Sequence, residues 1–338
     1  MYKRQRVDAA LAATPLNRYP DPMSNELRDE LAAQYGLARE QICVGNGGDE
    51  LLFNFLFAFG GPGRTLLNLP PCFSEYAFFA SLAQTEVRDV WRDAETFALD
   101  QDAALAAAPT CDLAIVTSPN NPTGDLAPLE FVEALCEACP GLVMVDEAYM
   151  EFASDPVEAA APVAEPVDGA TPGQISEPAS AVPLLARHSN LVVLRTLSKA
   201  FGEAGIRCGY VLAAPEVIDV FGAVRQIYSV NVLTQAAALA GVRERATFAP
   251  VVAQIRAERA RLQSGLAALP GVRVWPSAGN FLLVRMANAS EVRNRLRDEF
   301  SILVRDFSYA PGLADCLRIT VGTPAENDAV LAALHAIL

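Results

Sequence analysis

Residues 191–215 read LVVLRTLSKAFGEAGIRCGYVLAAP, two continuous apolar runs joined by a glycine-containing polar turn. Continuous apolar runs of this kind are typical of strands buried on both faces of a sheet. Lys199 follows the first run directly. Burial there favours the neutral amine of a lysine, which is the form that attacks an aldehyde. The stretch therefore predicts a covered sheet with a reactive lysine at the end of one strand; the alternative is a surface lysine with its stem packed on apolar atoms.

Similar apolar segments lie N-terminal to this stretch and alternate with helical segments. We expect strands within residues 42–48, 65–70, 112–119 and 141–149. An amphipathic helix is expected over residues 24–36, with Ser24 as its N-cap and Gly36 as its stop. The alternation indicates an α/β fold with a mostly parallel sheet between helices. In such sheets ligands bind beyond the carboxyl ends of the strands.

The pattern changes at about residue 222, where a long helical stretch leads into short strands interleaved with helices. We therefore expect a short N-terminal arm over residues 1–20, a large domain over residues 21–222 and a small α+β domain over residues 223–338. The Pro-, Ala- and Glu-rich residues 154–183 are interpreted as a disordered or loosely held surface insertion. A tolerated insertion and a regulatory segment remain the two alternatives for it.

Composition limits the classes of partner. The 338 residues are 52% apolar and carry a formal net charge of −14. Such an acidic chain argues against a nucleic-acid partner, because binding phosphate backbones takes a basic surface. No apolar run approaches the ~18 residues of a membrane span, and the first residues lack the apolar stretch of a secretory signal. We expect neither a nucleic-acid nor a membrane partner.

The seven cysteines are odd in number and lie mostly in apolar surroundings, which fits a reducing cytoplasm. Cys136 and Cys139 form a CxxC pair, for which a redox or metal site is one interpretation. Two small buried residues on a helix is the favoured one, because no second pair or histidine cluster accompanies them. His188 and His335 are the only histidines. The sequence therefore predicts no metal site.

The segment VDEAYMEF, residues 145–152, places a carboxylate at the end of an apolar strand. There Asp146 can hold a pyridine nitrogen protonated, which makes the ring an electron sink. Tyr149 lies three residues on and can hydrogen-bond a hydroxyl group of the ring. The alternative is an acidic residue that caps a helix.

Three further segments supply groups for a phosphate and for a ring oxygen. Thr196, Ser198 and Arg207 offer two hydroxyls and a forked cation, which suit a dianionic phosphate. The glycine turn GNGGDE, residues 45–50, opens an apolar helix and so provides free backbone N–H groups. In the turn SPNNPTG, the amide of Asn121 can donate to a phenolate oxygen. Taken singly, each turn has a purely structural alternative.

The segments RYPDP, GNGGDE, SPNNPTG, VDEAYMEF, RTLSKAFGEAGIRCGY and LRITVGT occur in the order and spacing found in fold-type I aminotransferases. From about residue 15 to the end, the set most resembles the histidinol-phosphate aminotransferase family. The resemblance implies a pyridoxal 5'-phosphate (PLP) enzyme with a mostly parallel seven-stranded sheet and a small C-terminal domain. It further implies a cytoplasmic homodimer that converts histidinol phosphate and 2-oxoglutarate to imidazole-acetol phosphate and glutamate in histidine biosynthesis.

The resemblance also implies a role for each matching residue. Lys199 would hold the cofactor as a Schiff base and act as the catalytic base, Asp146 would pair with the pyridine nitrogen, and Asn121 and Tyr149 would contact the ring oxygen. Gly48, Asp49, Thr196, Ser198 and Arg207 would bind the cofactor phosphate, together with Tyr19 from the partner subunit. Arg318 would bind the substrate carboxylate and Arg305 the substrate phosphate, next to Asn121.

Three departures from the family pattern stand out. Phe73, in PCF, takes the place of the usual stacking tyrosine, and Glu203 takes the place of an apolar residue. The usual LNxNExP segment, which covers the substrate, is not found before RYPDP. Rival interpretations are an aromatic or broad-range aminotransferase, a phosphothreonine decarboxylase-like enzyme and a non-catalytic PLP-binding regulator. The regulator is disfavoured, because the acidic chain shows no DNA-binding segment before RYPDP.

Overall fold

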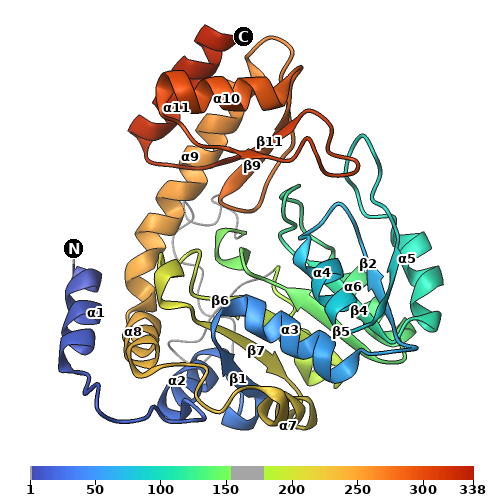
Figure 1. Ribbon diagram of the computed structural model, residues 1–338, viewed down its shortest axis with the longest axis vertical. Coiled ribbons are helices and arrows are strands. Elements are labelled where there is room, and N and C mark those ends of the chain that lie inside the picture. The colour runs from blue at the N-terminus through green and yellow to red at the C-terminus, as the bar shows by residue number, and fades with distance from the viewer. Residues whose placement is uncertain (1, 154–178) are drawn as a thin grey trace, which may run out of the picture.

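The computed structural model describes residues 2–153 and 179–338, in which two sheets are linked by a long helix (Figure 1). Among these residues the larger sheet has seven strands in the order β1-β7-β6-β5-β4-β2-β3. The strands are β1 Ile42–Gly45, β2 Thr65–Asn68, β3 Glu86–Asp89, β4 Leu113–Thr117, β5 Leu142–Asp146, β6 Leu191–Thr196 and β7 Gly209–Ala213. β7 runs antiparallel to β1 and β6, and the other pairs are parallel. The predicted fold class is confirmed.

Burial explains which strands were identifiable from the sequence. Every residue of β4, β6 and β7 is buried, so their sequences are continuous apolar runs with few polar residues. β3, with the sequence EVRD, is exposed throughout and was not predicted. It is an edge strand, where charged side chains discourage pairing with another chain.

Helices cover both faces of the larger sheet, as the alternation of segments predicted. Apolar residues on one face pack against α2 Asn25–Tyr35, α5 Gln101–Ala107, α6 Leu129–Ala138 and α8 Val232–Arg243. On the other face they pack against α3 Gly47–Phe59, α4 Glu75–Leu82 and α7 Pro215–Val224. α3 and α4 begin beyond the carboxyl-side turns of β1 and β2, so their N-terminal ends lie near the rim where the strands end.

The helix expected over residues 24–36 is α2, and it ends at Gly36 as expected. Its predicted N-cap is wrong. Ser24 adopts a left-handed conformation, with φ of 53°, and its side chain makes no capping hydrogen bond. Instead, the Asp21 carboxylate accepts from the backbone N–H of Asn25 at 2.7 Å and of Met23 at 2.9 Å. The Asp21 carboxylate thus satisfies the N–H of Asn25, the first residue of the helix, and holds the turn that leads into it.

The smaller sheet is antiparallel and has the strand order β10-β11-β9-β8 within the described residues. Its elements are β8 Arg273–Val274, β9 Phe281–Arg285, α10 Ala289–Phe300, β10 Arg305–Asp306, β11 Cys316–Thr320 and α11 Pro324–Ile337. The helices pack on one face of the sheet around a separate apolar core. The expected boundaries at residues 20 and 222 stay predictions.

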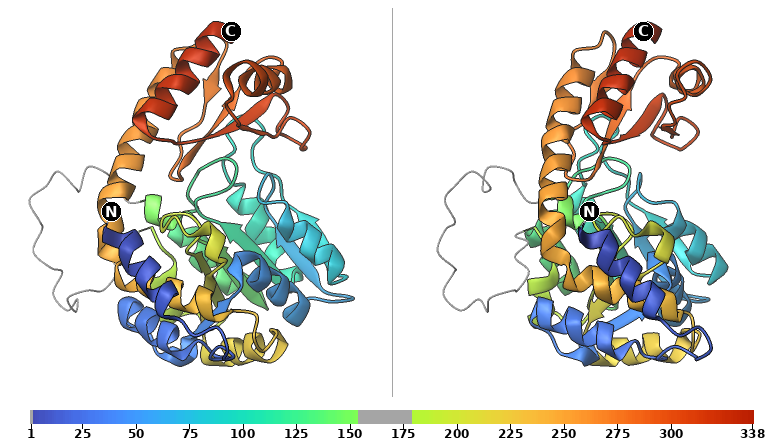
Figure 2. Two further views of the ribbon diagram at one scale, coloured as in Figure 1. Left: turned by 60° about the vertical axis from the view of Figure 1, so that its left-hand side comes forward. Right: turned by 90° about the vertical axis from the view of Figure 1, so that its left-hand side faces the viewer.

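The long helical stretch expected at the start of the small domain, residues 234–269, is divided. α8 ends at Arg243, a short 3-10 segment spans Arg245–Phe248, and α9 Ala249–Ala267 then rises from the larger sheet to the smaller one. Pro250 lies in the first turn of α9, where its missing N–H costs no helical hydrogen bond. α1 Tyr2–Ala13 packs beside α8 (Figure 2).

Most of the expected insertion, residues 154–178, lies outside the described residues. The described residues that follow it are anchored in the core. Ser180 Oγ and the backbone N–H of Ala181 donate to the buried carboxylate of Glu147, at 2.8 and 2.6 Å. The end of the insertion is therefore tied to the residue next to Asp146.

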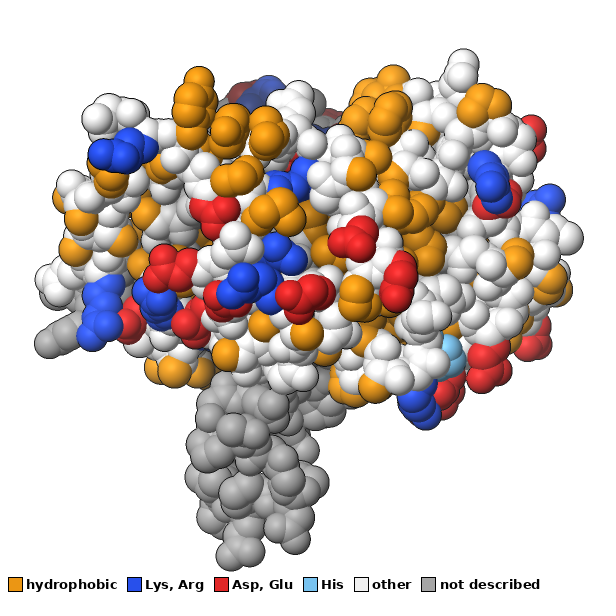
Figure 3. Space-filling view, turned by 90° about the horizontal axis from the view of Figure 1, so that it is seen from below, with side chains coloured by type: hydrophobic (Ala, Val, Ile, Leu, Met, Phe, Trp, Pro, Cys, Tyr) orange, Lys and Arg blue, Asp and Glu red, His pale blue; other side chains and the backbone are white. Residues whose placement is uncertain are grey.

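Acidic and basic side chains are interspersed on the face seen in Figure 3, with apolar side chains among them. This distribution gives a polyanion no continuous basic area on that face. None of the described helices has the length and apolar character needed to cross a bilayer.

Candidate active site

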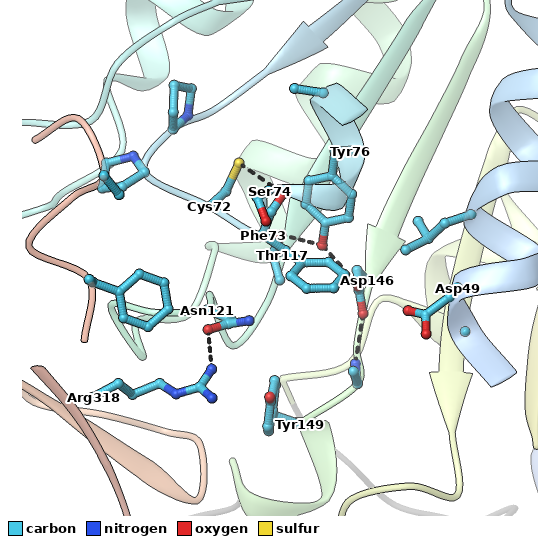
Figure 4. A pocket seen from close by; sticks show the side chains of 18 of the residues that line it. Asp49, Cys72, Phe73, Ser74, Tyr76, Thr117, Asn121, Asp146, Tyr149 and Arg318 are labelled. Carbon is cyan, nitrogen blue, oxygen red and sulfur yellow. Dashed lines mark hydrogen bonds between the residues drawn. The ribbon is translucent and has the colours of Figure 1, made fainter. Parts of the chain in front are cut away.

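A cavity of about 590 Å³ lies at the carboxyl ends of β4, β5 and β6 and extends to the smaller sheet (Figure 4). Apart from Tyr19, every site residue predicted from the sequence lines it. These residues are Gly48, Asp49, Phe73, Asn121, Asp146, Tyr149, Thr196, Ser198, Lys199, Arg207, Arg305 and Arg318. The larger sheet with its covering helix α3 and the smaller sheet together bring groups as far as 270 positions apart in the sequence to one cavity, from Gly48 to Arg318.

Asp146 is the last residue of β5 and is buried. The backbone N–H of Ala148 donates to Oδ1 at 3.0 Å, and the hydroxyl of Tyr76 donates to Oδ2 at 2.7 Å (Figure 4). Burial raises the pKa of Asp146, while these two hydrogen bonds and the charge of Lys199 act in the opposite direction. The carboxylate is thus fixed in direction, which suits it to pair with a ring nitrogen.

Tyr76 is a residue that the sequence analysis missed. Its ring is fully buried on α4, and its hydroxyl also lies 2.8 Å from Oγ1 of Thr117. Burial, followed by the negative charge of Asp146, raises the pKa of Tyr76 well above its usual value, so the phenol remains protonated. The sequence signal is spacing, since Tyr76 follows Phe73 by three positions and both side chains line the cavity.

Phe73 presents its ring to the cavity and packs edge-on against Tyr76, with ring centroids 5.6 Å apart and an interplanar angle of 84°. An aromatic face in this position can stack on a planar cofactor ring. The lining residues that the sequence analysis did not single out include Asn68, Asp89, Trp91, Thr117, Phe307 and Tyr309.

Lys199 lies in the turn beyond β6, with Nζ 5.2 Å from the centroid of the Tyr149 ring. The Tyr149 ring is buried and packs edge-on against Phe281. The expected burial of Lys199 itself is wrong, because the turn carries the side chain out of the sheet and into the open cavity. Lys199 is one of two lysines in the chain, the other being Lys3.

The N-terminal end of α3 packs tightly against Arg207 and β7. Gly47 has φ of 84°, and a Cβ atom there would lie 2.6 Å from Nη2 of Arg207. A Cβ atom on Gly209 would lie 2.7 Å from the backbone nitrogen of Gly48. Only glycine fits at these two positions, so the first N–H groups of the helix reach the cavity rim beside a guanidinium.

The groups available for a phosphate lie around this helix end. Oγ1 of Thr196 lies 2.9 Å from Oγ of Ser198 and accepts the backbone N–H of Ser198 at 3.1 Å. Nη2 of Arg207 lies 3.1 Å from Oδ2 of Asp49. Because that carboxylate would repel an anion, Asp49 can contribute only its backbone N–H to a phosphate. Hydroxyls, helix N–H groups and one guanidinium form a suitable donor set.

Arg318 and Arg305 are paired residues on neighbouring strands β11 and β10. Nη1 of Arg318 donates to Oδ1 of Asn121 at 2.5 Å, which leaves the NH₂ group of that amide as a donor toward the cavity (Figure 4). Burial lowers the pKa of Arg318, and the nearby Tyr149 partly offsets this. Arg305 is exposed and donates to the hydroxyl of Tyr309 at 3.2 Å. Two adjacent guanidinium groups at this end of the cavity form a donor set that suits an anion.

Tyr19 does not reach the cavity of its own chain. Its side chain is 81% exposed, and its ring stacks on Tyr228 with centroids 4.7 Å apart. The neighbouring Ile227 is 62% exposed. This small apolar surface lies apart from the residues that line the cavity.

The CxxC pair shows no sign of metal binding. Cys136 and Cys139 are buried free thiols, and burial raises the pKa of Cys136 to about 12. Among the described residues, no group of three or more His, Cys, Asp and Glu side chains could hold a metal ion. Both thiols pack in the apolar core beneath the larger sheet.

Comparison with known proteins agrees with the geometry. The family model for aminotransferase class I and II matches residues 2–334. The chain is 39% identical to the histidinol-phosphate aminotransferase of Corynebacterium glutamicum, with 96% of this chain and 84% of that protein covered. It is 40% identical to that of Chromobacterium violaceum, with 97% and 85% covered. The crystal structure of histidinol-phosphate aminotransferase from Sinorhizobium meliloti in complex with pyridoxal-5'-phosphate is similar with a TM-score of 0.84 at 27% identity, covering 98% of this chain and 86% of that one.

Proposed function

The chain belongs to the class I and II aminotransferases and, within them, to the histidinol-phosphate aminotransferases, and on this premise we propose that it interconverts histidinol phosphate and imidazole-acetol phosphate. Glutamate and 2-oxoglutarate are the second amino donor and acceptor pair. The observation that carries the proposal is 39–40% identity over almost the whole chain. Each half-reaction moves one amino group, so the kinetics are ping-pong.

The cofactor is PLP, which supplies an aldehyde and an electron-withdrawing ring when it is bound. The residues present fit it. One amine, Lys199, faces the cavity from beyond β6, and a hydrogen-bonded carboxylate, Asp146, ends β5. The close packing at Gly47 and Gly209 leaves the first N–H groups of α3 beside Arg207, where they can bind the phosphate of the cofactor. Lys199 and Asp146 lie at the ends of adjacent strands, so one planar ring can meet both.

The remaining cofactor contacts follow from where each group lies. Asn121 and Tyr149 are proposed to hydrogen-bond the ring oxygen, and Phe73 to stack on the ring face. Residues with donors for the phosphate surround the helix end: Gly48, Asp49, Thr196, Ser198 and Arg207. Fixed donors of this kind orient a ligand before any chemistry occurs.

Lys199 is proposed to act as the base as well as the anchor. Nζ of Lys199 is the one amine among the described residues that line the cavity, so it would move the proton to and from the substrate carbon that bears the amino group. Nζ lies over the Tyr149 ring, 5.2 Å from its centroid. Asp146 stabilises the positive ring nitrogen and so favours loss of that proton.

Arg318 and Arg305 are proposed to bind the anionic ends of the substrates. Glutamate brings a carboxylate and histidinol phosphate a phosphate, and both anions can be met by guanidinium groups. The adjacent positions of the two arginines on β11 and β10 support this. Arg318 would hold the carboxylate beside Asn121, and Arg305 the phosphate.

We further propose a homodimer in the cytoplasm. Tyr19 would reach the cofactor phosphate of the partner subunit, which accounts for a stacked and exposed tyrosine outside its own cavity. Exposed Ile227 beside it fits an apolar contact between subunits. All seven cysteines carry free thiols, six of them buried, which suits a reducing compartment.

The test is a spectrum of the purified protein followed by substrate addition. Histidinol phosphate should remove the visible band of the lysine-bound cofactor within one turnover, and 2-oxoglutarate should restore it. Phenylalanine and threonine phosphate are the comparison substrates, which represent the aromatic aminotransferase and decarboxylase alternatives. A band that responds to either of these and not to histidinol phosphate would refute the proposed substrate.

A further inference from the structure

Three hydroxyl and carboxyl groups form a buried chain beneath the cavity. Oγ1 of Thr117, the hydroxyl of Tyr76 and Oδ2 of Asp146 are linked by contacts of 2.8 and 2.7 Å (Figure 4). Thr117 ends β4 and lies directly opposite Asp146 in the pairing of β4 with β5. Tyr76 comes from α4, so its ring joins the ends of two strands to the helix that covers them.

The direction of these hydrogen bonds follows from the inventory of donors. An ionised carboxylate can only accept, so the single proton of the Tyr76 hydroxyl points at Asp146. The Tyr76 oxygen is then left as an acceptor, and Thr117 can donate to it. Each hydroxyl then donates one hydrogen bond, Thr117 to Tyr76 and Tyr76 to Asp146. Both hydrogen bonds favour the negative charge on Asp146.

We infer that Tyr76 is a positioning residue, which holds the Asp146 carboxylate charged and aimed at the ring nitrogen of the cofactor, and that Thr117 orients Tyr76. The inference rests on the proposed function only in taking Asp146 as the partner of that nitrogen. Without the phenol, Oδ2 would lose its donor in a buried site. The carboxyl would then take up a proton more readily and would pair less well with the cofactor.

Two other charged groups of the described residues act on Asp146. Lys199, in the turn after β6, favours the charged carboxylate, and Asp49, on α3, disfavours it. The N–H of Ala148 donates to the other carboxyl oxygen, Oδ1. Loss of Tyr76 therefore removes one of two direct donors and leaves the repulsion from Asp49 in place.

The experiment is titration of the cofactor-free apoprotein with PLP, followed by absorbance between pH 6 and 8.5, in the wild-type protein and in Tyr76→Phe. We expect the dissociation constant to rise about 10- to 100-fold in Tyr76→Phe, as for a lost hydrogen bond to a charged group. The loss should grow as the pH falls, because a carboxyl with a raised pKa is protonated first at low pH. Thermal stability of the apoprotein is measured in parallel.

Tyr210→Phe is the matched control. Tyr210 is also fully buried, and its hydroxyl lies 2.8 Å from that of Tyr35, away from the cavity. It should lose stability as Tyr76→Phe does but keep the wild-type affinity and pH dependence for PLP. Thr117→Val should weaken PLP binding in the same direction as Tyr76→Phe but less, and Thr117→Ser, which keeps the hydroxyl, should restore it.

The outcomes separate this inference from the proposed function. Unchanged affinity and pH dependence in both Tyr76→Phe and Thr117→Val overturn the inference alone, as does an equal loss in Tyr210→Phe. A wild-type protein that binds no PLP overturns the proposed function and this inference with it. Turnover of histidinol phosphate plays no part in the measurement, so a different substrate would leave the result for Tyr76 standing. If Tyr76→Phe does not fold, the Thr117 pair decides.

Discussion

The cavity wall at the ends of β4 and β5 differs in burial from the wall formed by Arg305 and Tyr309 at the smaller sheet. Asp146, Tyr76 and Thr117 are buried and linked to one another. Arg305 and Tyr309, on the opposite wall, are exposed, and Tyr309 is 72% accessible. A cofactor that remains bound through turnover benefits from fixed partners, whereas substrates that enter and leave need an accessible wall. Variants on each wall test this division.

The largest effect is expected for Lys199→Ala. The variant should lose the visible band of the lysine-bound cofactor, and turnover should fall by about 10⁴-fold, since both the anchor and the base are removed. Absorbance spectra and steady-state rates measure the two losses. Lys3→Ala is the control and should retain both. A Lys199→Ala variant with the wild-type spectrum would show that Lys199 does not hold the cofactor, and the assignment of this wall to the cofactor would fail.

Asp146→Asn should lower turnover by about 10²- to 10³-fold, because a neutral amide cannot balance the charge of the ring nitrogen. The Michaelis constants should change much less, since Asp146 belongs to the cofactor wall. Asp112→Asn is the control, because that carboxylate pairs with Arg64 on the surface. If the Michaelis constants rose as much as the turnover rate fell, the division into a wall for the cofactor and a wall for the substrates would be contradicted.

The two arginines should show smaller and selective effects. Arg318→Gln is expected to raise the Michaelis constant of glutamate by about 10- to 100-fold, as for a lost charge-assisted hydrogen bond, and to affect histidinol phosphate, which has no carboxylate, much less. Arg305→Gln should raise that of histidinol phosphate by about tenfold and affect glutamate little, because Arg305 is exposed. Steady-state kinetics with each substrate varied in turn measure these Michaelis constants. If either variant raised the Michaelis constants of both substrates equally, separate roles for the two arginines would be contradicted.

The smallest effect concerns stability. Burial raises the pKa of Asp146 in the folded chain, so folding favours its protonated form. The stability that this group contributes is full below its unfolded value of 3.8 and is lost as the pH rises through the folded pKa. Asn cannot ionise, so the Asp146→Asn apoprotein should melt about 2–4 °C higher than the wild type near pH 8. The difference in melting temperature between the two proteins should shrink at acidic pH. A difference that stays constant with pH would mean that altered packing, and not ionisation of Asp146, causes it.

The two walls also differ in how well the sequence predicted them. Lys199, Asp146 and Asn121 each follow an apolar strand, so the rule that ligands bind at the carboxyl ends of parallel strands is enough to locate them. Tyr76 escaped notice because it lies in the apolar stretch EYAFF of a covering helix, where a tyrosine resembles ordinary core. Its function depends on the register of β4 with β5, which sequence periodicity does not specify.

Other misses have similar physical causes. β3 has no apolar pattern, because an edge strand with exposed side chains buries nothing. Ser24 has the right residue type for an N-cap but a left-handed backbone, and the N–H of Asn25, the first residue of the helix, is instead bound by Asp21 three residues before Ser24. The rings of Tyr19 and Tyr228 stack on each other although they are more than 200 positions apart in the sequence. Local composition carries little information about such contacts.

The chain has only one lysine besides Lys199, so labelling of Lys199 can be used to count active sites. Guanidinium groups stay protonated, so the many arginines offer no competing amine to an aldehyde. Trypsin should cut the free chain after Arg195, Lys199 and Arg207. Borohydride reduction of the bound cofactor would block the cut at Lys199 and leave the single longer peptide of residues 196–207. The yield of that peptide would then count working sites in a preparation without reference to any substrate.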